Sequence, residues 1–149
     1  MPALNNADRI ATPPQESTEM DLPDELTALL RGTATCYIAT TMPDGSPQLT
    51  QTWADTDGEN IVTNTVQGYQ KARNIERDPR VAVSVSDPAN PSRYYVVRGR
   101  VAAATTAGGA EHIEALAQRY LGGPYPWYGG RDQVRVVLTI TPEKMHAMG

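Results

Sequence analysis

Cysteine and histidine are scarce in this chain of 149 residues, which has one cysteine and two histidines. The single cysteine, Cys36, cannot form an intrachain disulfide, which favours a reducing, cytoplasmic setting. Cys36 lies in a predicted strand, where the ordinary role of cysteine is that of a small buried apolar side chain. His112 and His146 are far apart in the sequence and, with Cys36, make a poor set of soft metal ligands. We therefore expect no structural zinc or other bound metal.

Long apolar runs and an excess of positive charge are also missing. No segment approaches the roughly 18 consecutive apolar residues that cross a bilayer, and the first residues contain no apolar core of a signal peptide. The chain has 13 Lys and Arg against 17 Asp and Glu, a formal net charge of −4. This balance argues against a whole-surface binder of nucleic acid or of an anionic membrane. It leaves room for a local basic pocket that binds a small anion.

Phenylalanine is absent, so aromatic bulk comes from seven Tyr and two Trp. Each carries a polar tip that needs a partner when buried, which suits a half-exposed pocket or a subunit interface. The chain also lacks the G-x-x-x-x-G-K-[ST] loop, a G-x-G-x-x-G turn after a strand, and the G-x-S-x-G elbow. No neighbouring histidine could activate Cys36 or a serine. An enzyme built from this chain would therefore rely on a cofactor for its chemistry.

The sequence predicts one domain, over residues 21–149, that follows a polar and flexible N-terminal arm, 1–20. Period-two alternation and β-forming residues predict six strands, over 35–41, 48–54, 60–64, 81–86, 94–104 and 133–141. Helical spacing predicts helices over 22–31, 66–77 and 107–121. Gly99, inside a long strand, suggests a bulge or bend. Six strands with short turns favour a mainly β fold, an antiparallel barrel with peripheral helices.

A polar cluster lies where the third predicted strand meets the second predicted helix. It contains Thr63 and Asn64, then Gln70, Lys71, Arg73 and Asn74. A helix N-terminus with nearby cations and neutral donors can bind a phosphate group. The alternative is a solvated basic helix face in which Asn64 is an ordinary N-cap.

A second cluster is the aromatic loop 122–132, with the sequence GGPYPWYGGRD. Tyr125, Trp127 and Tyr128 lie between glycines and prolines, and Arg131 follows them. A loop with this much aromatic surface buries it against its own barrel, a partner subunit or a planar ligand.

The segment 62–87, VTNTVQGYQKARNIERDPRVAVSVSD, resembles the central signature of the pyridoxamine 5′-phosphate oxidase-like split β-barrel superfamily. Within it, K-A-R-N-I-x-R-D-P-R-V at 71–81 resembles an actinobacterial branch of enzymes dependent on coenzyme F420, a deazaflavin. The hairpin 38–54 and the tail 129–149 also resemble that branch. The resemblance implies an FMN-binding-like split barrel of six strands, and a homodimer with two cofactor sites at its interface.

The resemblance also implies roles for individual residues. Gln51, Thr52 and Trp53 would lie along the ring system of the cofactor, and Thr63 and Asn64 would contact its ring edge, ribityl chain or phosphate. The phosphate end would be bound by Gln70, Lys71, Arg73 and Asn74. From the other subunit, Trp127 and Arg131 would approach. Apart from the resemblance, an F420-dependent enzyme built from this chain has four tyrosines as candidate proton donors, Tyr69, Tyr95, Tyr125 and Tyr128, and the sequence does not choose among them.

One departure from the family pattern bears on the cofactor. The flavin-phosphate oxidases carry an arginine at the start of the second strand and an Arg-Lys pair ahead of the helix. Here 49–54 has no basic residue, and the pair reads Gln70-Lys71. Each missing charge-assisted contact is worth about 1.5–3 kcal/mol, which weakens the case for FMN. Lys71 with Arg73 suits a phosphodiester of one negative charge, as in F420.

The resulting hypothesis is an F420-dependent oxidoreductase that transfers a hydride between the deazaflavin and an unsaturated or quinone-like small molecule. Two alternatives stay open. One is an FMN-dependent oxidase or reductase of the same fold, and the other is a carrier that binds F420 without turnover.

Overall fold

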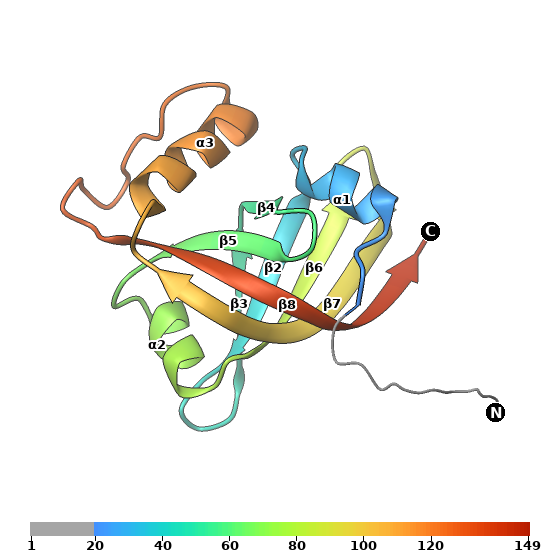
Figure 1. Ribbon diagram of the computed structural model, residues 1–149, viewed down its shortest axis with the longest axis horizontal. Helices are drawn as coiled ribbons and strands as arrows, with labels where there is room; N and C mark the ends of the chain where they lie inside the picture. The colour runs from blue at the N-terminus through green and yellow to red at the C-terminus, as the bar shows by residue number, and fades with distance from the viewer. Residues whose placement is uncertain (1–19) are drawn as a thin grey trace.

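The computed structural model describes residues 20–149, so the predicted arm lies, except for its last residue, outside the described range. Within that range one antiparallel sheet of seven strands curls around a core, with three helices outside it (Figure 1). The helices are α1 (Asp24–Leu30), α2 (Gln70–Arg77) and α3 (Gly109–Leu121). The strands are β2 (Thr35–Thr41), β3 (Pro47–Thr52), β4 (Ala54–Thr56), β5 (Ile61–Val66), β6 (Arg80–Asp87), β7 (Asn90–Thr105) and β8 (Arg135–Met148).

Alternating apolar residues place the core inside the curled sheet. In β6, Val81, Val83 and Val85 are buried while their neighbours are not, and β8 alternates in the same way. Because successive side chains of a strand point to opposite faces, this pattern lines one face of the sheet with apolar groups. Leu26 and Leu30 of α1 join the same core cluster and are fully buried.

The predicted number of six strands is wrong, because the segment 48–54 is not one strand. The structure breaks it at Trp53: β3 pairs with β2, whereas β4 pairs with β5. The turn after β4 begins at Asp57, whose carboxylate accepts the backbone N–H groups of Glu59 and Asn60 at 2.9 and 2.7 Å. Periodicity does not reveal such a break, because it reports which face a residue occupies and not which strand it pairs with.

The break at Trp53 connects the two edges of the sheet through the chain itself. The strand order is β3-β2-β6-β7-β8-β5-β4, so the two edges of the sheet, β3 and β4, are consecutive in sequence. They are joined by one residue and not by a ladder of hydrogen bonds. The barrel is therefore split along this line.

The second helix is shorter than predicted. We expected it to begin at Val66, but Val66 is the last residue of β5 and pairs with Arg135 of β8. Gly68, with φ at +89°, then turns the chain into α2. Strand pairing takes precedence here over the helical spacing of the apolar residues.

The bulge predicted at Gly99 is confirmed. The register between β7 and β8 shifts between Arg98 and Gly99, opposite Thr141 and Pro142. A Cβ at Gly99 would overlap the carbonyl oxygen of Thr141 and would lie 3.2 Å from Cα of Pro142. Only glycine allows the two backbones to come this close.

None of the helices described is long and apolar enough to cross a membrane.

We expect Gly99→Ala to destabilise the fold by about 1–3 kcal/mol, because the added methyl group forces β7 and β8 apart. Gly123→Ala is the matched control, since a Cβ there meets nothing within 4 Å. Urea unfolding of both variants measures the difference. Equal stability of the two variants would show that the bulge tolerates a side chain.

Candidate functional site

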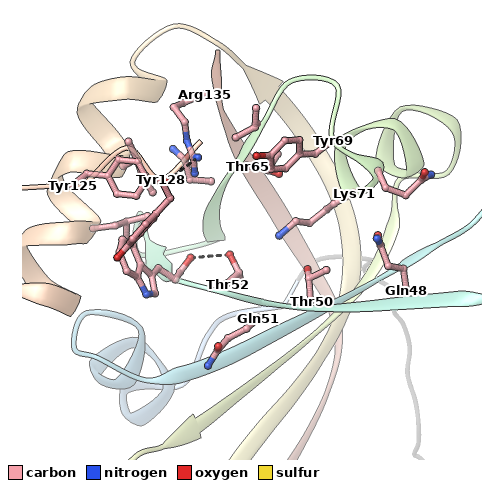
Figure 2. A pocket seen from close by; sticks show the side chains of 16 residues that line it. Gln48, Thr50, Gln51, Thr52, Thr65, Tyr69, Lys71, Tyr125, Tyr128 and Arg135 are labelled. Atoms are coloured by element: carbon pink, nitrogen blue, oxygen red, sulfur yellow. Dashed lines mark hydrogen bonds between the residues drawn. The ribbon is translucent and has the colours of Figure 1, made fainter. Parts of the chain in front are cut away.

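A cavity of about 440 Å³ lies between β3, the end of β5, the first turn of α2, and α3 with the aromatic loop (Figure 2). Six of the eleven residues predicted for the cofactor site line it: Gln51, Thr52, Trp53, Asn64, Gln70 and Lys71. Ten others complete its lining: Gln48, Thr50, Thr65, Val66, Tyr69, Ile113, Leu116, Tyr125, Tyr128 and Arg135. The volume lies within the range of small-molecule sites.

The β3 side of the cavity is neutral and polar. Gln48, Thr50 and Thr52 alternate inward along the strand, and Figure 2 shows them in a row below Lys71. The hydroxyl of Thr50 is buried and has no hydrogen-bond partner among the residues that the structure describes. An unpaired buried hydroxyl costs free energy, so this face is suited to a ligand that brings a hydrogen-bonding group.

Two cations, Lys71 and Arg135, point into the cavity from α2 and β8. Burial, and then the positive charge of Arg135, lowers the pKa of Lys71 to about 8. Burial also lowers the pKa of Arg135. Among residues 20–149, neither side chain has a carboxylate within ion-pair distance. Two half-buried cations without an acid between them make the cavity a site for an anion.

Aromatic side chains form the opposite side. Trp53 stacks on Tyr120 of α3, with ring centroids 5.2 Å apart and planes inclined by 9°. Tyr125 meets the rings of Trp53 and Tyr128 edge-on, at 6.2 and 5.6 Å. Tyr128 is 73% exposed, so it stands at the rim. The cavity therefore has a charged end and an apolar, planar wall.

Asn74 does not reach the cavity but holds two residues that do. It is fully buried, and its amide donates to Oγ1 of Thr40 at 3.0 Å and to Oε1 of Gln48 at 3.2 Å. Its Oδ1 accepts Nε2 of Gln70 at 2.7 Å. Asn74 is thus a positioning residue between β2, β3 and α2.

The other four predicted residues also lie outside the cavity. Thr63 is buried in β5 between Ala54 and Leu138, and Arg73 is exposed and bonds back to the carbonyl of Gly68.

In the aromatic loop, the indole N–H of Trp127 donates to Glu114 at 2.8 Å, and the guanidinium of Arg131 lies 5.3 Å from the indole ring. That Trp127 and Arg131 reach the cavity of a partner subunit stays a prediction.

The alternative role of Asn64 as an N-cap is wrong. Asn64 lies inside β5, opposite Val137, and α2 has no side-chain cap. The alternative of a solvated helix face applies to Arg73, which is exposed, but not to Lys71, which lines the cavity. Of the four candidate tyrosines, Tyr95 is excluded from the cavity: it is buried in the core and donates to Glu25 at 3.1 Å.

Sequence reasoning missed Arg135, the second cation. The available signal was a charged residue among valines at the start of the last strand, at 134–138. Arg135 comes to lie next to Lys71 because β8 pairs with β5, where Arg135 stands opposite Val66. This pairing joins residues that are far apart in sequence.

The comparison with known protein families covers nearly all of the described range. A model of the pyridoxamine 5′-phosphate oxidase family matches residues 22–149. The chain belongs to this family. Its fold is thus a pyridoxamine 5′-phosphate oxidase-like antiparallel half-barrel, as the sequence resemblance predicts.

Solved structures of similar fold include an F420 reductase, with 34% identity over 84% of this chain and 98% of that one, and a TM-score of 0.73. A conserved hypothetical protein from Mycobacterium tuberculosis has 25% identity over 90% of this chain and 88% of its own, with a TM-score of 0.68. General Stress Protein 26 from Bacillus anthracis, at 19% identity, covers 84% of this chain and 92% of its own, with a TM-score of 0.61, and shows the fold alone. No curated protein matches the sequence.

We expect Asn74→Ala to lower stability by about 1–3 kcal/mol, because it removes the donor to Oγ1 of Thr40 and one of the two donors to Oε1 of Gln48. Arg73→Ala, on the exposed face of the same helix, should change stability by less than about 0.5 kcal/mol. Thermal unfolding of both variants makes the comparison. A neutral Asn74 variant would contradict the role assigned to its hydrogen bonds.

We expect Arg135→Gln to raise the pKa of Lys71 above about 8, because it removes a positive charge that disfavours the ammonium form. NMR titration of the Lys71 side chain measures the shift. Arg100→Gln, which removes an arginine paired with Glu143, is the control and should leave the pKa unchanged. An unaltered pKa in the Arg135 variant would rule out close approach of the two cations.

Proposed function

We propose that this protein is an F420-dependent oxidoreductase that reduces an unsaturated or quinone-like organic substrate. The observation that carries the proposal is that two cations, Lys71 and Arg135, lie at one end of a cavity whose other side is aromatic. An anionic tail and a planar ring system are the two parts of a flavin-type cofactor. The 34% identity with an F420 reductase supports the deazaflavin in particular.

The residues present fit such a cofactor. Lys71 and Arg135 offer positive charge, and the unpaired hydroxyl of Thr50 offers a hydrogen bond to the phosphate or the chain next to it. The first turn of α2 has no side-chain cap, so its backbone N–H groups are free of side-chain competition for an anion. Trp53 and Tyr125 offer apolar surface to the rings.

When bound, the deazaflavin supplies the hydride that reduces the substrate. The chain binds, orients and shields. Trp53 is held by its stack on Tyr120 and would fix the plane of the rings. The hydroxyl groups of Tyr69, Tyr125 and Tyr128 border the cavity and are the candidate proton donors.

FMN is the second candidate cofactor, and Arg135 favours it. The sequence pattern lacks two arginines that flavin-phosphate oxidases use, but Arg135 brings one guanidinium into the cavity from β8. With Lys71 this makes two positive charges, enough for a phosphate monoester. A carrier that binds F420 without turnover is the third candidate.

We further propose that the working form is a homodimer. Tyr69 and Tyr128, at the rim of the cavity, are 50% and 73% exposed. A binding site commonly buries most of its ligand, so a second copy would complete the wall. Trp127 and Arg131 are the residues expected to cross over. Light scattering of the purified protein tests this part.

Titration of the protein with F420 and, separately, with FMN tests the proposal, with cofactor fluorescence as the signal. We expect F420 to bind with a Kd in the micromolar range or below, and FMN to bind more weakly. Lys71→Ala should raise the Kd for F420 about 5- to 150-fold, the equivalent of about 1–3 kcal/mol. Lys144→Ala, an exposed lysine of β8, is the matched control.

The outcomes separate the three candidates. Oxidation of reduced F420 by quinones or enones supports the reductase, whereas tight binding without turnover across such a panel supports the carrier. Preference for FMN moves the protein to the flavin-dependent branch. Binding of neither cofactor overturns the proposal.

A further inference from the structure

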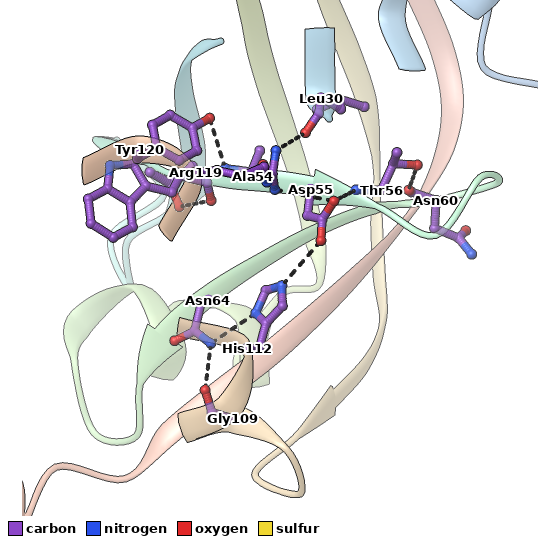
Figure 3. A network of polar contacts seen from close by, with 12 residues as sticks. Leu30, Ala54, Asp55, Thr56, Asn60, Asn64, Gly109, His112, Arg119 and Tyr120 are labelled. Atoms are coloured by element: carbon purple, nitrogen blue, oxygen red, sulfur yellow. Dashed lines mark hydrogen bonds and ion pairs between the residues drawn. The ribbon is translucent and has the colours of Figure 1, made fainter. Parts of the chain in front are cut away.

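Asn64 connects the cavity to a histidine behind it. The guanidinium Nε–H of Arg135 donates to Oδ1 of Asn64 at 2.7 Å. On its other side, Nδ2 of Asn64 donates to the carbonyl of Gly109 at 3.1 Å and lies 3.0 Å from Nδ1 of His112. Figure 3 shows Asn64, Gly109 and His112 gathered between β5 and the start of α3. Asn64 is 5% exposed, so water does not replace these partners.

These contacts leave one orientation for the Asn64 amide. Arginine has only donors, so the atom facing Arg135 must be the amide oxygen. A carbonyl has only lone pairs, so the atom facing Gly109 must be the amide nitrogen. The second hydrogen of that nitrogen points to Nδ1 of His112, which must therefore carry a lone pair. His112 is consequently neutral, with its proton on Nε2.

A carboxylate lies on the Nε2 side of the ring, which is compatible with a proton there. Nε2 is buried and has no hydrogen-bond partner among the described residues, and Oδ2 of Asp55 lies 3.9 Å away. Three charged groups face the imidazole: Asp55 from β4, Arg119 from α3 and Arg135 from β8. Asp55 is itself paired with Arg119, at 3.3 Å. Two cations and a carboxylate that is already paired leave little to stabilise an imidazolium.

We propose that His112, in its neutral Nε2–H form, is a positioning residue that locks Asn64 and thereby aims the Arg135 guanidinium into the cavity. The inference rests on the proposed function only for the identity of the anion that Arg135 binds. It gives a role to a histidine that touches neither the cavity nor a metal.

Protonation of His112 breaks this chain of contacts. A proton on Nδ1 would meet the Asn64 N–H, and rotation of the amide would turn its nitrogen toward the Nε–H of Arg135. Either arrangement sets two donors against each other. Burial lowers the pKa of His112, against the opposite pull of Asp55, so the neutral form persists below the usual range. The lock is present above that pKa and is lost as the pH falls through it.

The tautomer can be measured without any ligand. Long-range ¹H–¹⁵N spectra of the imidazole should show His112 as the Nε2–H tautomer in the wild-type protein at pH 7. The Nε–H signal of Arg135 should be protected from exchange. A proton on Nδ1, or on both nitrogens, at this pH would overturn the inference whatever the protein binds.

Two variants separate positioning from packing. His112→Asn can place its Oδ1 where Nδ1 stands and so keep an acceptor, whereas His112→Leu has similar bulk and no acceptor. We expect protection of the Arg135 Nε–H to survive in the Asn variant and to fall at least about tenfold in the Leu variant. Equal protection in both folded variants, or loss in both, would contradict the proposed role.

Binding gives the second readout. At pH 7 the Kd for F420 should rise about tenfold in His112→Leu and stay within about twofold in His112→Asn. The wild-type affinity should fall as the pH drops through the pKa of His112, while the affinity of the Asn variant should not show this step. Identical pH profiles for the wild type and the Asn variant would overturn the proposed lock. Absence of F420 binding to the wild type would instead refute the proposed cofactor and leave the tautomer result standing.

Discussion

Arg119 and Tyr120 of α3 hold the break at Trp53 in place, and the cavity depends on this contact. The guanidinium of Arg119 donates to the carbonyls of Leu30, Gly32 and Ala54, at 2.8, 2.7 and 3.2 Å. The hydroxyl of Tyr120 donates to the carbonyl of Ala34 at 2.8 Å, while its ring stacks on Trp53. The end of α1, the residue before β2, Trp53 and the start of β4 are thus tied to one helix, which also carries His112 and the apolar wall of the cavity.

The positive charge in the cavity lowers the stability of the folded protein, and packing in the core offsets this loss. The lowered pKa of Lys71 means that the folded protein disfavours the ammonium form relative to water. An anionic ligand would remove that penalty on binding, because it would supply the opposite charge that residues 20–149 do not place there. Stability comes from elsewhere, chiefly from the cluster of buried aliphatic side chains inside the sheet. A charged Lys71 therefore favours anion binding but lowers the stability of the ligand-free protein.

Local signals in the sequence predict much of this fold, and long-range pairing explains what they do not. The alternation in β6 and β8 and the bulge at Gly99 can be predicted from the sequence, because each depends on residues that are close together in the chain. Lys71 and Trp53, which the family resemblance implies as cofactor contacts, both line the cavity. The resemblance also implies that Asn74 binds the phosphate end, whereas this residue faces inward to Thr40 and Gln48. The contact between Arg135 and Asn64 joins residues 71 positions apart, and no spacing rule within one strand or helix predicts it.

The place of α3 in the chain has a consequence for how this site can diversify. The helix and the aromatic loop fill the connection between β7 and β8, two strands that pair with each other from Thr105 opposite Val137 onward. The sheet thus holds both ends of the insertion close together, and its length can change without shifting the strand register. Arg135 and the strands behind it belong to the constant frame, whereas Tyr125 and Tyr128 belong to the exchangeable segment. Relatives could bind new ligands through changes in this single connection while they keep the same cationic end of the cavity.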